Sequence, residues 1–369
     1  MRVDSTRSLL VYGGAHALTD AICAAAVIAA SLALLASGGA SGGYVLSLAL
    51  AYNFLAFAGQ LPLGMLLDRL RTPRTFAGVG LMLCAAALQF AHVLPEMVVI
   101  LCGVGNALFH LGGGAVALTL APGKAGPPGV FVAPGAVGLF LGFRLGMQGV
   151  SGNAATIIFV AAACLAGTMA FLPLPAGYAR RDRKNPKEIT QTENEPVSKG
   201  MLFALAAAMC SIVIRSYVGL TLDFPWKETG FAFACALVVA GACGKAAGGL
   251  LADCFGFARL SCGALLCAIP LLFLSRTSVV AGLAGSLCFQ MTMAVTLLAC
   301  LRVFPGREGT AFGLNCIALF VGSLPLLLPF REVVNMFQPL RVPVVQAALV
   351  FVSLLCLGWG LRRLWSGGR

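Results

Sequence analysis

The sequence predicts an all-α, polytopic membrane protein with twelve transmembrane helices in two six-helix repeats. Three observations support this fold class. The 369-residue chain is 59% hydrophobic and 10% charged, with a mean hydropathy of +0.94, whereas soluble domains have about 25% charged residues. The apolar residues form runs that are long enough to cross a bilayer. Short motifs also recur in the same order at an offset of about 180 residues.

The first half of the chain contains six apolar runs, and a spanning helix needs about 20 such residues. The first run is longer than a signal peptide, holds Asp20 and is followed by similar runs, so we interpret it as a mature helix. "DRLRTPR" separates the second run from the third, and "PGKAGPP" separates the fourth from the fifth. The six runs are 9–36, 44–68, 76–93, 97–121, 129–149 and 153–173.

A long polar stretch, residues 174–200, separates these runs from six more and predicts a linker between halves 1–173 and 201–369. Most Lys and Arg residues between the runs fall on the side that holds both termini and this linker. By the positive-inside rule, we expect an inner (cytoplasmic) membrane protein with both termini in the cytoplasm. The second six runs are 201–222, 229–253, 259–275, 277–301, 309–329 and 340–361.

Composition also argues against several classes of function. The formal charge is +12, but the basic residues cluster in short gaps between apolar runs, so we expect lipid rather than nucleic acid as the partner. The 14 cysteines lie in or beside apolar runs without a CxxC pair, which is typical of small hydrophobic residues rather than a metal site. Without a Walker A or hydrolase motif, we expect no cofactor and no enzymatic activity.

Three pairs of motifs define the repeat. "LGMLLDRL" (63–70) matches "GGLLADCF" (248–255), "GNALFH" (105–110) matches "GSLCFQ" (285–290), and "APGKAG" (121–126) matches "FPGREG" (304–309). Two parallel repeats of six helices are the plan of the major facilitator fold.

The loop after the second run, "GMLLDRLRTPR", resembles the major facilitator signature G-x-x-x-D-R-x-x-R, and "GGLLADCFGFAR" is a weaker second copy. The sequence departs from the signature where Leu70 and Arg71 replace its glycine. The resemblance implies a conformational gate, in which a carboxylate pairs with arginines and faces a helix N-terminus in the other half. The alternative is a charge cluster that only ends a helix. The gate candidates are Gly64, Asp68, Arg69, Arg74, Gly249, Asp253 and Arg259.

A narrower resemblance is to the fosmidomycin-resistance branch of this superfamily. It is carried by "GGAHALTDAI", "YNFLAFAGQLPLGMLLDRL", "GVGNALFHLGGGAVAL", "IRSYVGL" and "GKAAGGLLADCFG", although Leu111 replaces the branch's proline. The resemblance implies secondary transport by alternating access, in the direction of export.

The ionisable residues inside the runs are the functional candidates, because charges within a membrane usually face a cavity or a partner. His16 and Asp20 are four residues apart and share a helix face. Asp20 is the acidic residue deepest in any run, so we expect it to bind the coupling proton with the assistance of His16. Arg215 has a similar depth in the second half, which suggests an Asp20–Arg215 pair. A static pair that fixes packing is the alternative.

The other polar residues in the runs suggest a substrate site. Lys245 and Gln60 are repeat-related, as are His110 and Gln290, and the surplus of positive charge favours a small anionic solute. Lys245 could instead extend to the membrane surface, and Arg144 and His110 could serve packing alone. The predicted substrate-binding residues are Arg144, Arg215, Lys245, His110, Gln60 and Gln290.

These expectations describe a monomeric secondary transporter that exports a small, anionic solute and uses the proton gradient as its energy source. An uptake symporter or an anion exchanger is an alternative within the same class. A receptor without transport activity or a membrane-embedded enzyme is an alternative from another class.

Overall fold

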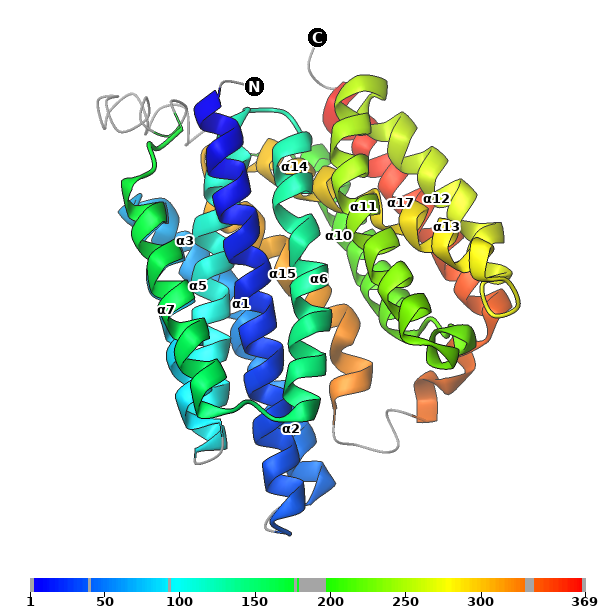
Figure 1. Ribbon diagram of the computed structural model, residues 1–369. Coiled ribbons are helices and arrows are strands. Elements are labelled where there is room, and N and C mark those ends of the chain that lie inside the picture. Colours follow the sequence, from blue (N-terminus) through cyan, green and yellow to red (C-terminus); the bar gives the residue numbers. More distant parts are fainter. Residues whose placement is uncertain are drawn as a thin grey trace.

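The computed structural model describes residues 3–38, 41–91, 94–175, 178, 197–328 and 335–366. Eleven of the helices within these residues are long and apolar enough to cross a membrane, and α12 (Phe257–Phe273) is a shorter apolar helix. Each of the twelve predicted runs corresponds to one of these segments, which confirms the all-α, multi-pass architecture (Figure 1).

Seven α-helices lie within the described residues of the first half. The second span consists of α2, a π-helical turn η1 and α3, and a short 3-10 turn η2 ends the third span. The elements are α1 (Val3–Ala36), α2 (Gly42–Asn53), η1 (Phe54–Ala58), α3 (Gln60–Leu70), α4 (Pro73–Ala87), η2 (Leu88–Phe90), α5 (Pro95–Leu120), α6 (Gly126–Gln148) and α7 (Gly152–Phe171).

The second half begins with α10, inside the predicted linker, and most of that linker (176–177 and 179–196) lies outside the described residues. The remaining elements are α10 (Lys199–Thr221), η3 (Pro225–Thr229), α11 (Phe231–Phe255), α12, α13 (Val279–Gln290), α14 (Met293–Val303), α15 (Glu308–Leu327), η4 (Gln338–Arg341) and α17 (Pro343–Ser366).

Each half has its own apolar core, and the halves meet along two helix pairs. One core is built mainly from α1, α4, α5 and α7, and the other mainly from α10, α12, α14 and α17. The pairs α6–α11 and α3–α15 join the halves. In Figure 1, α1 and α7 lie on one side, α12 and α17 lie on the other, and α15 runs between them.

Glycines allow the helices around the centre to approach closely. Gly138 and Gly142 on α6 face the backbone carbonyls of Ala17 and Ala21 on α1, and a Cβ atom at either glycine would overlap them. Small residues at this spacing let membrane helices pack backbone to backbone. The contact brings α6 against the face of α1 that carries the predicted proton site.

Two predicted spans are interrupted where the sequence suggested continuous helices. In span 44–68, the amide of Gly59 donates to the carbonyl of Phe54 at 2.9 Å, which closes a π-helical turn. In span 277–301, the helix stops at Gln290 and restarts at Met293. No proline stands at either interruption, so hydropathy did not reveal them. π-Helical turns of this kind are frequent at functional sites.

Both ends of the chain reach the same end of the bundle. α1 begins there and α17 ends there (Figure 1). Because successive spans alternate in direction, α3 and α11 also end there, and α6 and α15 begin there. We call this the terminal end of the bundle and the opposite one the far end.

Candidate functional site

At the terminal end, Asp68 joins the two halves of the molecule. It lies near the end of α3, and its carboxylate accepts hydrogen bonds from the first turn of α15 in the other half. The amides of Gly309 and Thr310 donate to it at 2.7 and 2.8 Å, and the Thr310 hydroxyl donates at 2.7 Å. These groups have no partner within their own helix, and the helix dipole favours an anion there.

Asp253 makes the repeat-related contact with the roles of the two halves exchanged, because its carboxylate belongs to the second half and the amides that bond it belong to the first. It lies near the end of α11 and accepts hydrogen bonds from the amides of Ala125 and Gly126 at 2.7 and 2.9 Å, where α6 begins. Gly249 packs one turn away against the carbonyl of Ala125. Gly64 and Gly309 likewise contact each other through their backbones, where a Cβ atom on either would overlap the other's carbonyl oxygen. The two halves are therefore closed against each other at the terminal end.

The arginines of the signature do not pair with these carboxylates as expected. Arg69 and Arg259 are exposed, and Arg74 donates to the carbonyl of Ala170 in the last turn of α7 at 3.4 Å. The cross-half ion pair is made instead by Arg71, which replaces the signature's glycine and lies 3.7 Å from Glu308. The carboxylates are occupied by backbone amides, because the helix N-termini offer better-placed donors than the flexible guanidinium groups.

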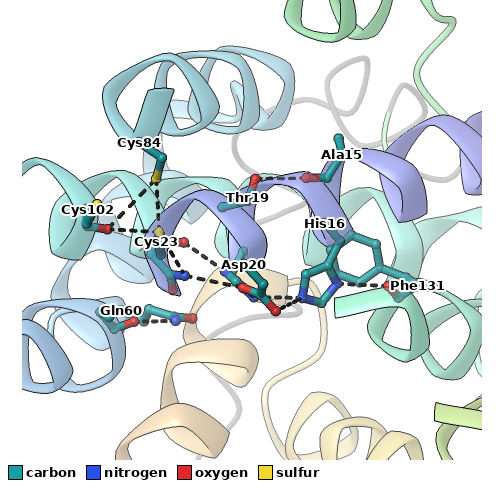
Figure 2. A network of polar contacts seen from close by, with 12 residues as sticks. Ala15, His16, Thr19, Asp20, Cys23, Gln60, Cys84, Cys102 and Phe131 are labelled. Atoms are coloured by element: carbon teal, nitrogen blue, oxygen red, sulfur yellow. Dashed lines mark hydrogen bonds and ion pairs between the residues drawn. The ribbon is translucent and has the colours of Figure 1, made fainter. Parts of the chain in front are cut away.

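A second group of polar side chains lies near the middle of the first half, and we call it the histidine cluster (His16, Asp20, Asn106 and His110). The two Nε2 atoms of His16 and His110 are 2.8 Å apart. The Asp20 carboxylate lies 3.2 Å from Nε2 of His16 and 3.6 Å from Nε2 of His110. Figure 2 shows Asp20 and His16 side by side, with the His16 ring directed at Phe131. The cluster brings together two predicted proton-coupling residues and His110, which was expected to bind substrate.

Asn106 is the member of this cluster that the sequence analysis missed. It lies one turn before His110 on α5, and its side-chain amide donates to Asp20 at 3.4 Å and to Cys23 at 3.7 Å. The thiols of Cys23 and Cys84 are 3.5 Å apart beside it. A buried polar residue four positions before a buried histidine was the available signal, and it indicated a shared face on α5.

The cluster is also the place where these residues could hold a metal ion. Among the described residues, the ligand atoms of His16, Asp20 and His110 form a group in which all lie within 4.8 Å of one another. Around zinc, two imidazole nitrogens bonded at about 2.0–2.1 Å in tetrahedral geometry lie roughly 3.3 Å apart. The separation of 2.8 Å between the two Nε2 atoms is shorter than that and matches a hydrogen bond.

In the second half, Arg215 is buried on α10 but has no hydrogen bond at two of its nitrogens. Its side chain is 7% exposed, and neither Nε nor Nη1 has a partner among the described residues. Its guanidinium lies 5.9 Å from the centre of the Phe289 ring. The expected Asp20–Arg215 pair is therefore absent from this structure, because Asp20 is held by the histidines of its own half.

Lys245, not Arg215, is the cation of the second half that interacts electrostatically with Asp20. It is half-buried on α11. Arg144 lies apart from this group, because it is exposed near the far end of α6, where its guanidinium lies 5.5 Å from the centre of the Phe231 ring. The three basic residues therefore do not converge on one point.

The two predicted glutamines lie beside the interruptions of their helices. Gln60 is buried directly after the π-helical turn, where its Nε2 donates to the carbonyl of Ala56 at 2.6 Å and its Oε1 has no partner among the described residues. Gln290 is the last residue of α13 and packs against Gly241 and Gly244 of α11. Neither side chain contacts the histidine cluster through a hydrogen bond within the described part of the chain.

Comparison with known proteins shows which fold this geometry belongs to. No protein-family model and no curated protein matches the sequence. Among solved structures, one match is the MFS transporter FucP in the outward conformation. It has a TM-score of 0.63 and 12% identity, and the match covers 98% of this chain and 100% of that chain. FucP is also described as the E. coli fucose:proton symporter. The chain has the fold of the major facilitator transporters.

Two further structures agree with this assignment. The human organic anion transporter MFSD10 matches with a TM-score of 0.64 and 14% identity, over 96% of this chain and 99% of that one. The proton:xylose symporter XylE, bound to 6-bromo-6-deoxy-D-glucose, matches with a TM-score of 0.64 and 15% identity, over 96% of this chain and 94% of that one. These similar structures are all of transporters and not of enzymes.

Proposed function

We propose that this protein is a proton-coupled secondary transporter that exports a small anionic solute across the inner membrane, as its resemblance to the fosmidomycin-resistance branch implies. It acts as a monomer with both termini in the cytoplasm, and it takes its energy from the proton gradient without a cofactor. The observation that supports an anionic substrate is the buried guanidinium of Arg215, two of whose nitrogens lack hydrogen-bond partners among the residues that the structure describes.

Arg215 supports an anionic ligand because a buried charged donor without a partner is costly, by about 1–3 kcal/mol or more. Arg is always protonated in proteins, and its planar group bonds carboxylates and phosphates in a bidentate manner. A solute with such a group would satisfy the free donors. The Phe289 ring beside it supports the guanidinium in a fixed orientation through a cation–π contact.

The histidine cluster supports proton coupling. Histidine is the side chain whose charge changes most readily near neutral pH, and here two histidines face one partly buried carboxylate. Asp20 remains our proposed coupling carboxylate, with His16 beside it. His110, first assigned to the substrate, now belongs to the proton site.

The contacts at the terminal end support alternating access. Asp68 and Asp253 each bond a helix N-terminus of the other half, so separation of the halves at this end breaks both contacts. With the terminal end in the cytoplasm, the closed gate corresponds to a state that is shut on the inside. Opening it exposes the site to the cytoplasm.

The test is transport by the purified full-length protein in proteoliposomes with an imposed pH gradient. We would screen phosphonates, fosmidomycin included, and carboxylates, first by thermal stabilisation and then by flux. We expect an anion to bind to wild type, Arg215→Lys to bind it at least about tenfold more weakly, and Arg215→Ala to lose binding. If Arg215→Ala binds the anion as tightly as wild type, the anionic site is placed wrongly.

An uptake symporter is the second candidate, since FucP and XylE are described as proton symporters. The same liposomes distinguish the alternatives. Export is driven by protons moving against the solute, and symport by protons moving with it. An anion exchanger would transport without a pH gradient and would tolerate Asp20→Asn. A receptor or an enzyme would show no flux for any anion.

A further inference from the structure

The two imidazole rings of the histidine cluster are held in fixed tautomers by backbone carbonyls. Nδ1 of His16 lies 2.8 Å from the carbonyl oxygen of Phe131 on α6, and Nδ1 of His110 lies 2.9 Å from that of Asn106 on α5. A carbonyl oxygen can only accept a hydrogen bond, so both Nδ1 atoms must carry a proton. The two Nε2 atoms are then the only ring nitrogens left to share or exchange a proton.

These Nε2 atoms face each other at 2.8 Å, with the ring planes at 87°. If neither carried a proton, two lone pairs would oppose each other at hydrogen-bond distance. If both carried one, two N–H groups would oppose each other. A single proton between them makes one hydrogen bond and turns the pair into a singly charged imidazolium–imidazole unit.

We propose that His16 and His110 hold one proton between their Nε2 atoms, with Asp20 as its counter-ion, and that this shared proton is the one coupled to transport. The second part rests on the proposed function, whereas the first does not. The proton arrives from the aqueous phase on one side of the membrane, binds the lone pair of one Nε2, and leaves to the aqueous phase when the site faces the other side, so no other bond changes.

The surroundings leave Asp20 as the acid that balances this proton. Its two oxygens face one Nε2 each, and Asn106 donates to Oδ1. Phe312 of α15 adds an apolar ring beside His110, and α6 adds the apolar ring of Phe131 beside His16, with the two ring centres 4.7 Å apart. The other titratable groups within electrostatic range are Cys23 on α1, Tyr52 on α2, Cys84 on α4, Cys102 on α5 and Lys245 on α11. Of these, Lys245 is the one basic side chain.

Gly135 on α6 leaves the space in which the cluster assembles. A Cβ atom at this position would lie 2.5 Å from both the Oδ2 atom of Asp20 and the Nε2 atom of His16. Gly135→Ala therefore disturbs the cluster without removing any titratable group. This makes it a matched variant for tests in which Asp20 or a histidine is replaced.

The decisive experiment is nitrogen-15 magnetic resonance of histidine-labelled, full-length protein in lipid nanodiscs, with no substrate present. The chain has three histidines, so His16→Gln and His110→Gln assign the signals. We expect both Nε2 atoms to share one proton, seen as scalar coupling between the two nitrogens and as one positive charge on the pair at neutral pH. Two neutral rings without coupling would overturn the proposal.

Asp20→Asn keeps both rings and removes the counter-ion, so we expect the pair to bind the shared proton at least about tenfold more weakly. Gly135→Ala should weaken the coupling without removing a charge. If a variant fails to fold, the wild-type spectrum still decides. Addition of Zn²⁺ tests the competing use of the same atoms: stoichiometric binding that shifts both Nε2 signals without prior acidification would identify a metal site and overturn the shared proton.

The outcome of the magnetic resonance experiment can be distinguished from the outcome of the transport experiment. Coupling between the two nitrogens with no pH-driven flux would retain the shared proton and reject proton-coupled transport. Proton-driven flux without that coupling would do the reverse.

Discussion

The polar groups at the centre of the two halves satisfy their hydrogen-bonding needs in opposite ways. In the first half, His16, Asp20, Asn106 and His110 bond to one another. In the second half, Arg215 is buried, and two of its nitrogens have no hydrogen-bond partner in the part of the chain that the structure describes. The polar groups of the histidine cluster are satisfied within the first half, whereas the two unbonded nitrogens of Arg215 leave donors that a ligand from outside could fill. Under the proposed function, the two repeats would thus carry different tasks on the same fold.

The largest effect is expected from removing the acid that completes the first half. Asp20→Asn leaves a charge on the histidines without its partner, and breaking a buried pair costs about 3 kcal/mol or more, a loss of about a hundredfold in affinity for the shared proton. We expect proton flux in proteoliposomes to fall by a similar factor. Flux is measured with a pH-sensitive dye inside the vesicles.

The matched control is Asp223→Asn, because Asp223 forms an exposed ion pair with Arg276 at 3.2 Å. It should leave flux within about twofold of wild type, since exposed pairs contribute little. Equal losses in the two variants would mean that Asp20 has no special role.

The contacts of Asp68 and Asp253 at the terminal end allow a second comparison of the two halves. Asp68 accepts three hydrogen bonds from α15, and Asp253 accepts two from α6. Hydrogen bonds to a charged group are worth about 1.5–3 kcal/mol, so Asp68→Asn should shift the equilibrium toward an open terminal end by roughly tenfold or more. Asp253→Asn should shift it less.

Distances between spin labels at the end of α3 and the start of α15 would report this equilibrium. Thr310→Val provides the control, because it removes one donor to Asp68 and leaves the carboxylate and both amides. A larger shift for Asp253→Asn than for Asp68→Asn would contradict the ranking.

The smallest effects are expected from the two cations that flank these sites. Lys245→Gln removes a charge that interacts with Asp20, so we expect a change of about threefold in anion affinity, by attraction at intermediate range. Arg144→Gln removes an exposed cation–π contact worth about 0.5–1 kcal/mol, and affinity should change by less than about twofold.

Binding titrations with the anion found in the screen would measure both variants. A larger effect of Arg144→Gln than of Lys245→Gln would mean that the substrate enters near the far end of α6 rather than between α10 and α11.

The sequence was sufficient for the features that depend on hydropathy and repetition. The twelve spans follow from apolar length, and the positions of Asp68 and Asp253 follow from their repeat-related motifs. It was not sufficient for contacts that depend on helix rotation. Arg215 has a depth similar to that of Asp20, but equal depth sets no distance across the interface, so the expected pair was wrong. The contact between His16 and His110 arises from packing between α1 and α5, which no local pattern specifies.

Helix α6 carries both a gate contact and a part of the histidine cluster. Gly126 bonds Asp253, and the carbonyl of Phe131 fixes the tautomer of His16. These two positions are about 7.5 Å apart along the helix, and Pro134, which follows them, lacks the amide that would stiffen that stretch. Any tilt of this segment when the gate releases therefore moves the hydrogen-bond acceptor of His16. Opening of the gate at the membrane surface and displacement of the His16 hydrogen bond in the interior would thus be two readouts of one movement.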